Sequence, residues 1–142
     1  MNKLLYAKNK LKNGNHTLVI CADCDTIISD QNGIRPLLEA SEVIGSASDI
    51  FAADKIVGKA AALLYVLIGA KAVFAQVLSQ QAKDVFDRFG IEYEYETLTD
   101  QIVNRRGDGL CPMEQAVQNV EEPNQAKQAI LEALRKLKSK QP

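Results

Sequence analysis

The chain has 142 residues, 46% of them hydrophobic and 25% charged, which predicts one domain with a single core over residues 1–142. Seventeen basic and 18 acidic residues give a net charge of −1, so the basic surplus typical of nucleic-acid-binding proteins is missing. The longest apolar run is shorter than the roughly 20 residues of a membrane span, and the first residues lack the apolar region and cleavage site of a signal peptide. We therefore expect a soluble, cytoplasmic protein that binds neither nucleic acid nor membrane, and three cysteines without a paired framework agree with a reducing compartment.

The first part of the chain predicts a helix followed by a hairpin. Apolar residues recur at helical spacing over residues 3–12. Two apolar, β-branched runs at 17–22 and 25–29 predict a hairpin whose strands are covered on both faces. Proline at the first helical position predicts a short helix over 36–40, and a loop then leads to a brief strand at 49–53.

Asp54 is a favourable N-cap and predicts a helix that runs to about Ile68, where Gly69 ends it. This helix is apolar almost all round, so we expect it to be buried at the centre. The remaining predicted elements are a strand at 71–79, a helix at 80–89, a strand at 91–96, a helix at 112–120 and a last helix from Pro123. Together they predict a three-layer α/β/α sandwich with an added C-terminal helix.

Three segments and the order of the elements resemble a known family. The order helix, hairpin, helix, strand, helix, strand is similar to the cytidine-deaminase-like fold. Over nearly its whole length the chain resembles the family called domain of unknown function 1893, which implies a deaminase-like fold without an established activity. The segments that carry the resemblance are GIRPLL (33–38), ADKIVGKAAAL (53–63) and NRRGDGLCPME (104–114).

The zinc motifs of deaminases are absent from the corresponding positions. In zinc-dependent deaminases a His-Ala-Glu or Cys-Ala-Glu motif opens one helix and a Pro-Cys-x-x-Cys motif opens the next. Here those positions hold Asp54-Lys55-Ile56 and Ser79-Gln80-Gln81-Ala82, which supply neither thiolate nor imidazole. We therefore expect no metal, no other cofactor and no zinc-dependent deamination.

The helix predicted to begin at Asp54 carries two cations near its start. Lys55 and Lys59 are four residues apart and would share one helix face, where they oppose the helix dipole. A phosphate or carboxylate bound by the free backbone N–H groups and the lysines would offset this, and Gly58 would permit its close approach. The alternative is that both lysines are solvated or paired with Asp49 or Asp54.

The segment 104–114 is the densest in site chemistry. Arg105 and Arg106 present planar forks suited to phosphate or carboxylate. Gly107 and Gly109 would let the backbone form an anion-binding nest around Asp108. The alternative is a flexible, solvated loop with an Arg–Asp pair.

Cys111 and Glu114 suit the start of the helix predicted at Pro112. Cys111 would be the N-cap, and Glu114 could reach back to it as in a capping box. A thiol at a helix start beside two arginines has the setting of a reactive cysteine, although Glu114 opposes this. Cys111 is therefore interpreted either as a partly buried capping residue or as a nucleophile.

The remaining candidates are weaker. Cys21 and Cys24 have C-x-x-C spacing, but across a predicted turn rather than at a helix start, which argues against a zinc or redox site. His16, the only histidine, is expected to be a surface residue.

We hypothesise that the chain binds a phosphate-bearing, nucleotide-like or other anionic small molecule. Two alternatives stay open: an enzyme that uses Cys111 as nucleophile or Asp54 and Glu114 as acid and base, and a noncatalytic homo-oligomeric assembly protein. The residues predicted to bind the ligand are Lys55, Gly58, Lys59, Asn104, Arg105, Arg106, Gly107, Asp108 and Gly109.

Overall fold

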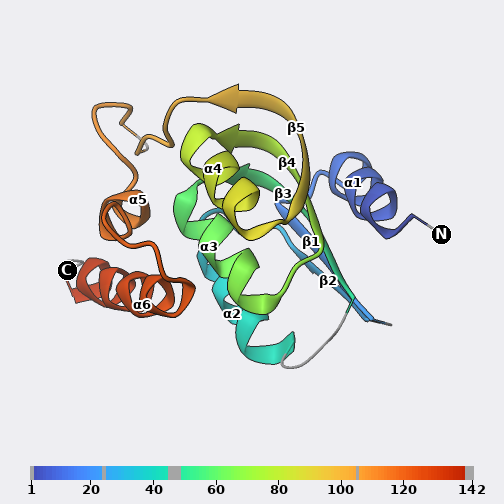
Figure 1. Cartoon of the computed structure of the whole chain (residues 1–142), viewed down its shortest axis with the longest axis horizontal. Helices are drawn as coiled ribbons and strands as arrows, with labels where there is room; N and C mark the ends of the chain where they lie inside the picture. Colours follow the sequence, from blue (N-terminus) through green and yellow to red (C-terminus); the bar gives the residue numbers. More distant parts are fainter. Residues whose placement is uncertain (1, 24, 45–48, 105, 140–142) are drawn as a thin grey trace.

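A mixed sheet of five strands forms the centre of the computed structural model, which describes residues 2–23, 25–44, 49–104 and 106–139 (Figure 1). The sheet order is β2-β1-β3-β4-β5, with β1 antiparallel to both of its neighbours and β3, β4 and β5 parallel to one another. The strands are β1 (Leu18–Ala22), β2 (Asp25–Ser29), β3 (Ile50–Val57), β4 (Ala72–Ser79) and β5 (Glu92–Thr99).

Helices flank the sheet on both sides (Figure 1). Helix α1 packs against β1, β3 and β4 from one face, while α2, α3 and α4 lie on the opposite face and α6 packs on the outside of α3. The predicted α/β class, with helices around a sheet, is confirmed. The helices are α1 (Lys3–Asn13), α2 (Arg35–Ile44), α3 (Lys59–Ile68), α4 (Gln80–Phe89), α5 (Pro112–Ala116) and α6 (Pro123–Ser139).

The burial of α3 follows from its sequence and position. Its first six residues, 60–65 after the opening lysine, are all buried, because the sheet lies on one side and helices lie on the others. Gly69 ends the helix with φ 79°, a left-handed conformation that glycine adopts without a Cβ clash. The prediction of a central apolar helix that ends at Gly69 is confirmed.

The predicted start of α3 is wrong, because Asp54 lies within β3. Parallel pairing with β4 continues to Val57 opposite Leu78, so the strand includes the residue expected to cap the helix. The side chain of Asp54 accepts a hydrogen bond from the Tyr65 hydroxyl, and Gly58 is the N-cap. Lys55 is therefore a strand residue, and it does not share a helix face with Lys59.

Two other local predictions need correction. Helix α2 continues to Ile44, beyond the predicted end at residue 40, because buried Leu37, Leu38 and Ala40 give it a continuous apolar face. Strand β2 is an edge strand with exposed residues rather than a strand covered on both faces. Cys24 and residues 45–48 lie outside the described part of the chain.

Several chain segments meet at one end of the strands, where β1 begins and β3 ends. Because β1 is antiparallel to β3, Leu18 near the start of β1 lies opposite Asp54 near the end of β3. Strands β2 and β3 both end here, and the segments that follow them lead into α2 and α3. In sheets with parallel strands, ligands bind in the crevice outside the carboxyl ends of the strands.

Candidate functional site

A cavity of about 320 Å³ lies at this end of the sheet, beside the start of β1 and the end of β3. Its walls come from the start of β1, the segment 31–34 that leads into α2, the end of β3, the first turn of α3, residues 102 and 103, and residues 111, 113 and 114. Most of the lining is apolar, with a few polar groups between. A small, largely apolar cavity with a few polar side chains is typical of a small-molecule site.

Asp54 and Tyr65 form a hydrogen-bonded pair at this cavity. The Tyr65 hydroxyl donates to Oδ2 of Asp54 at 2.7 Å, and Tyr65 itself is fully buried. Burial raises the pKa of Asp54 to about 7, although the hydrogen bond from Tyr65 and the backbone N–H groups of Ile56 and Lys55 oppose the shift. Burial also raises the pKa of Tyr65, and the neighbouring Asp54 charge adds to that shift. At neutral pH the Asp54 carboxyl can therefore donate or accept a proton.

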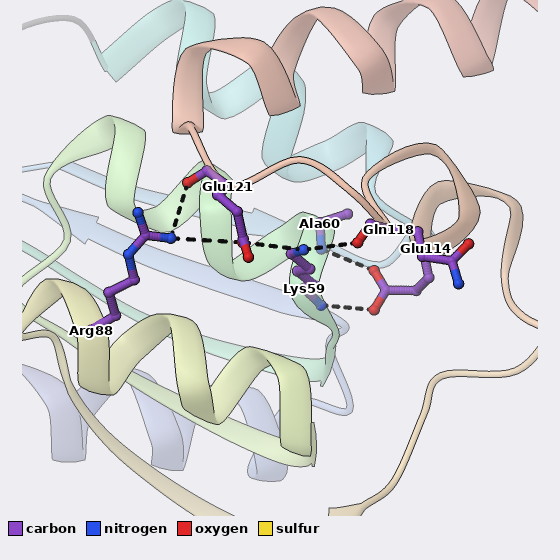
Figure 2. A network of polar contacts seen from close by, with 6 residues as sticks. All are labelled: Lys59, Ala60, Arg88, Glu114, Gln118 and Glu121. Atoms are coloured by element: carbon purple, nitrogen blue, oxygen red, sulfur yellow. Dashed lines mark hydrogen bonds and ion pairs between the residues drawn. The ribbon is translucent and has the colours of Figure 1, made fainter.

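Glu114 closes the N-terminus of α3. Its carboxylate accepts the Lys59 N–H at 2.7 Å through Oε1 and the Ala60 N–H at 2.9 Å through Oε2 (Figure 2). These are two of the N–H groups that a helix leaves without internal partners, and the negative charge lies at the positive end of the helix dipole. A Cβ on Gly58 would clash with the Glu114 carboxylate, which could not then stay in its present position.

Lys59 extends this contact between α3 and the segment after α5 (Figure 2). Its Nζ donates to the Gln118 carbonyl oxygen at 3.2 Å and lies 3.3 Å from Oε2 of Glu121. Arg88 of α4 approaches the same carboxylate at 3.6 Å. One acidic side chain, Glu121, thus pairs with the charge of Lys59 at the start of α3 and is shared with Arg88.

The predicted anion site at this helix is therefore filled by the protein itself. The N–H groups expected to hold a phosphate donate to Glu114, and Lys59 is paired within the chain. The predicted capping box within α5 is also wrong, because Glu114 reaches α3 and the N-cap Cys111 makes no side-chain cap bond. The sequence could not reveal that a residue 54 positions away would cap the helix.

Five of the residues predicted for the site line the same cavity. The three candidate acid, base or nucleophile residues come together there, and so do two of the predicted ligand-binding residues. Lys55 is exposed at the cavity and has no ion-pair partner among the described residues, so its charge is available to a ligand. The five are Asp54, Lys55, Gly58, Cys111 and Glu114.

The loop ahead of Cys111 does not join them. Oδ1 of Asn104 accepts the N–H groups of Gly107 and Asp108, and its Nδ2 donates to Asp108. Of the N–H groups around the predicted anion-binding nest, those of Gly107 and Asp108 are thus used within the loop. Of the described residues between Asn104 and Gly109, none lines the cavity, and Arg106 is exposed. Arg105 lies outside the described residues.

The histidine and the cysteine of the first strand lie elsewhere. His16 Nδ1 contacts Asp30 and does not line the cavity. Cys21 belongs to the core beneath α1, and burial raises the pKa of its thiol. Within the described ranges, no three His, Cys, Asp or Glu side chains form a group that could hold a metal ion.

Tyr65 is one of two residues at the site that sequence analysis did not predict. It is the only residue of α3 with a hydroxyl, in a helix otherwise made of Ala, Leu, Val, Ile and one Lys. A buried hydroxyl needs a hydrogen-bond partner, and this could have been noticed. Thr17 was missed too, and its hydroxyl at the cavity wall lies within hydrogen-bond distance of the Ser29 and Gln31 carbonyl oxygens, to either of which it can donate its one proton.

The family model described as a domain of unknown function, DUF1893, matches residues 6–134. The chain belongs to this family. A crystal structure of a DUF1893 family protein from Thermotoga maritima has a TM-score of 0.83 and 22% sequence identity, covering 93% of this chain and 90% of that one. At this identity the likeness shows a shared fold. The comparison with curated proteins gave no match. None of the helices in the described part of this DUF1893 protein is both long and apolar enough to cross a bilayer.

Proposed function

We propose that this DUF1893 protein binds a nucleotide-like small molecule in the cavity beside Asp54. The observation that carries the proposal is a carboxyl with a pKa of about 7 in a mostly apolar cavity of about 320 Å³. This volume is at the lower end of the roughly 300 to 1,000 Å³ of small-molecule sites. The ring would lie against the apolar walls with its polar edge toward Asp54.

Lys55 is the residue we propose for the phosphate. The start of α3 is filled by Glu114, so an anionic group would have to bind elsewhere. Lys55 lines the cavity, is exposed, and has no ion pair with any described side chain. The phosphate would therefore stay at the solvent side while the ring is buried.

We also propose a cytidine-deaminase-like fold for the chain. The sheet order β2-β1-β3-β4-β5, with helices on both faces, supports it. Deaminase chemistry is not part of the proposal, because the described residues do not fit the zinc that it needs. The first turn of α3 holds Gly58, Lys59 and Ala60, and Glu114 is already bonded to two N–H groups.

The binding proposal can be tested with a panel of nucleoside monophosphates. We expect at least one to raise the melting temperature of the wild-type protein, and Asp54→Asn to reduce that shift. Asp84→Asn is the matched control, because Asp84 is an exposed carboxylate on α4 outside the cavity. A panel without any shift, or a shift that Asp54→Asn leaves unchanged, would contradict the proposal.

A second candidate function is proton-transfer catalysis at the same site. General acid–base catalysis is most efficient when the pKa of the group lies near the working pH, which the burial of Asp54 provides. Cys111 lines the same cavity and is the alternative nucleophile. Product analysis after incubation with the bound nucleotide separates them: acid–base catalysis is lost in Asp54→Asn and kept in Cys111→Ala, and nucleophilic catalysis shows the reverse.

Self-association is the third candidate, for which β5 has a free edge within the described sheet. A two-fold pairing centred on Glu94 would place that residue opposite its own copy and Glu92 opposite Glu96. Like charges directly opposite one another are destabilising. If the chain assembles, we therefore expect contacts other than this strand, and analytical ultracentrifugation of Glu94→Gln, which removes the like charges at the centre of this pairing, tests this. Dimers that form only in the variant would support the argument.

A further inference from the structure

Tyr65 does not itself line the cavity, but its hydroxyl is hydrogen-bonded to Asp54, which does. Its side chain is fully buried, and its ring packs against Phe86 with 6.5 Å between the ring centroids. The hydroxyl donates to Oδ2 of Asp54 at 2.7 Å. A ring fixed by packing holds its hydroxyl in place, so the Asp54 carboxyl is oriented from behind.

The direction of this hydrogen bond determines what Asp54 can offer. Because Tyr65 donates to Oδ2, the carboxyl proton of neutral Asp54 belongs on Oδ1. An ionised carboxylate has about four acceptor positions. Tyr65 takes one on Oδ2, and the backbone N–H groups of Lys55 and Ile56 also approach the carboxylate. The remaining acceptor capacity can take N–H groups from a ligand, and a carboxylate accepts such bonds more strongly once it is ionised.

The charges around Asp54 are few. On the neighbouring strands Leu18 and Ala75 lie opposite it, and neither is charged. Helix α3 contributes Tyr65, and its own strand contributes the backbone N–H groups of the next two residues. The titratable side chains that share the cavity with Asp54 are Lys55, Cys111 and Glu114.

Of these three, Glu114 is oriented toward α3, where its two carboxylate oxygens accept two backbone N–H groups. Lys55 is exposed to solvent, which screens its charge. Burial, which raises the pKa of Asp54, and the Tyr65 hydrogen bond, which lowers it, are therefore the main opposing influences on this carboxyl.

The geometry points to Tyr65 as a positioning residue that aims the Asp54 carboxyl at the cavity, where it is a pH-dependent acceptor for a ligand bearing N–H donors. The inference rests on the proposed function, because it names the ligand edge that the same cavity selects. A guanine-like ring with two adjacent N–H groups has the required edge. Such a ligand binds ionised Asp54, so its affinity rises with pH.

The role of Tyr65 can be measured without any ligand. Carbon-13 NMR of the Asp54 carboxyl gives its titration midpoint in the wild type, in Tyr65→Phe and in Tyr93→Phe. Removing the hydrogen bond that favours the ionised form should raise the midpoint by about one pH unit in Tyr65→Phe. Tyr93→Phe is the matched control, because its hydroxyl donates to Asp87 outside the cavity. A midpoint that does not move in Tyr65→Phe, or that moves equally in both variants, overturns the positioning role.

The ligand edge is tested with guanosine and inosine 5′-monophosphate, which differ by one amino group. We expect guanosine monophosphate to bind roughly tenfold more tightly and both to bind more tightly at about pH 8 than at about pH 6. Tyr65→Phe should move the midpoint of this pH profile upward. Asp54→Asn should abolish the pH dependence of binding, and this second variant still tests the inference if Tyr65→Phe folds poorly.

The two possible failures can be told apart. Binding of both nucleotides with equal affinity or without pH dependence overturns the inferred ligand edge and leaves the proposed function standing. No binding of any nucleotide overturns the proposed function and the inferred edge together, while the NMR titration still decides the role of Tyr65.

Discussion

The cavity has two carboxyl groups on different walls, Glu114 and Asp54, and their surroundings differ. On the α5 wall, Glu114 accepts two backbone N–H groups at the positive end of α3. On the β3 wall, Asp54 has one strong side-chain partner in an apolar setting, and burial raises its pKa to about 7. Glu114 therefore caps a helix, whereas the Asp54 carboxyl can exchange a proton near neutral pH. Titratable groups whose surroundings differ in this way are how a site divides structural from chemical roles.

The largest expected effect is the pH dependence that Asp54 gives to stability. Its pKa rises on folding from an unfolded value of about 3.9 to about 7, so the folded state binds the proton more tightly. The free energy of unfolding should be highest below about pH 4 for this group and fall by up to about 4 kcal/mol as pH rises through 7.

Urea denaturation at several pH values checks this. Asp54→Asn cannot titrate, so its stability should lose this slope between about pH 4 and pH 7. The pKa values of Asp49 and Glu96 are lowered by Lys71 and Lys12, so their contributions are lost at lower pH, below the unfolded values. A slope in Asp54→Asn equal to that of the wild type would contradict the assignment.

On the other wall, Glu114→Ala should be the most damaging substitution. It leaves two N–H groups of α3 without a partner in a buried setting and removes the charge that offsets the helix dipole. We expect a loss of about 3 kcal/mol in the free energy of unfolding, measured by urea denaturation. Glu114→Gln, which keeps one acceptor oxygen, should lose about half as much. Glu121→Ala is the control: its carboxylate is largely exposed, and we expect at most about 0.5 kcal/mol.

Gly58→Ala should break the same contact from the helix side. The added Cβ would lie 2.4 Å from Oε1 of Glu114, so the carboxylate must move away from the N–H groups. We expect a loss of about 2 kcal/mol. Gly109→Ala is the matched control, because its nearest atom would be Nδ2 of Asn104 at 3.7 Å, an ordinary contact. Equal stabilities of the two variants would show that Gly58 is not needed for the close approach.

The contrast between the walls also explains what could be predicted from the sequence. Local signals predicted most elements: the helix expected at 80–89 is α4, and Gly69 ends α3 as its residue type indicates. The start of α3 was misplaced because Asp54 has the residue type of a cap while strand pairing and Tyr65 gave it another role. A local pattern cannot show which distant side chain competes for a capping residue.

The same limit applies to the candidate site. Asp54, Cys111 and Glu114 were singled out from residue type and spacing, and the fold brings all three to one cavity. Glu114 bonds the N–H of Ala60, which is 54 residues earlier in the chain. Which helix Glu114 caps therefore depends on tertiary packing. The glycines and Asp108 of the 104–109 loop suggested anion binding, but Asn104 accepts the N–H groups of Gly107 and Asp108. Such internal satisfaction is visible only in three dimensions.

The smallest effect concerns Lys59, whose charge had suggested a bound anion. Its side chain is only 12% exposed, and its Nζ meets the Gln118 carbonyl oxygen and the Glu121 carboxylate. Lys59→Met keeps the apolar stem and removes the charge, so we expect a loss of about 1 kcal/mol in the free energy of unfolding. Lys83→Met, which removes a more exposed lysine paired with Asp87 within α4, should show no measurable change. If Lys59 instead served a ligand, its substitution would leave stability unchanged and weaken nucleotide binding, whereas an internal tether predicts lower stability with binding retained at low temperature.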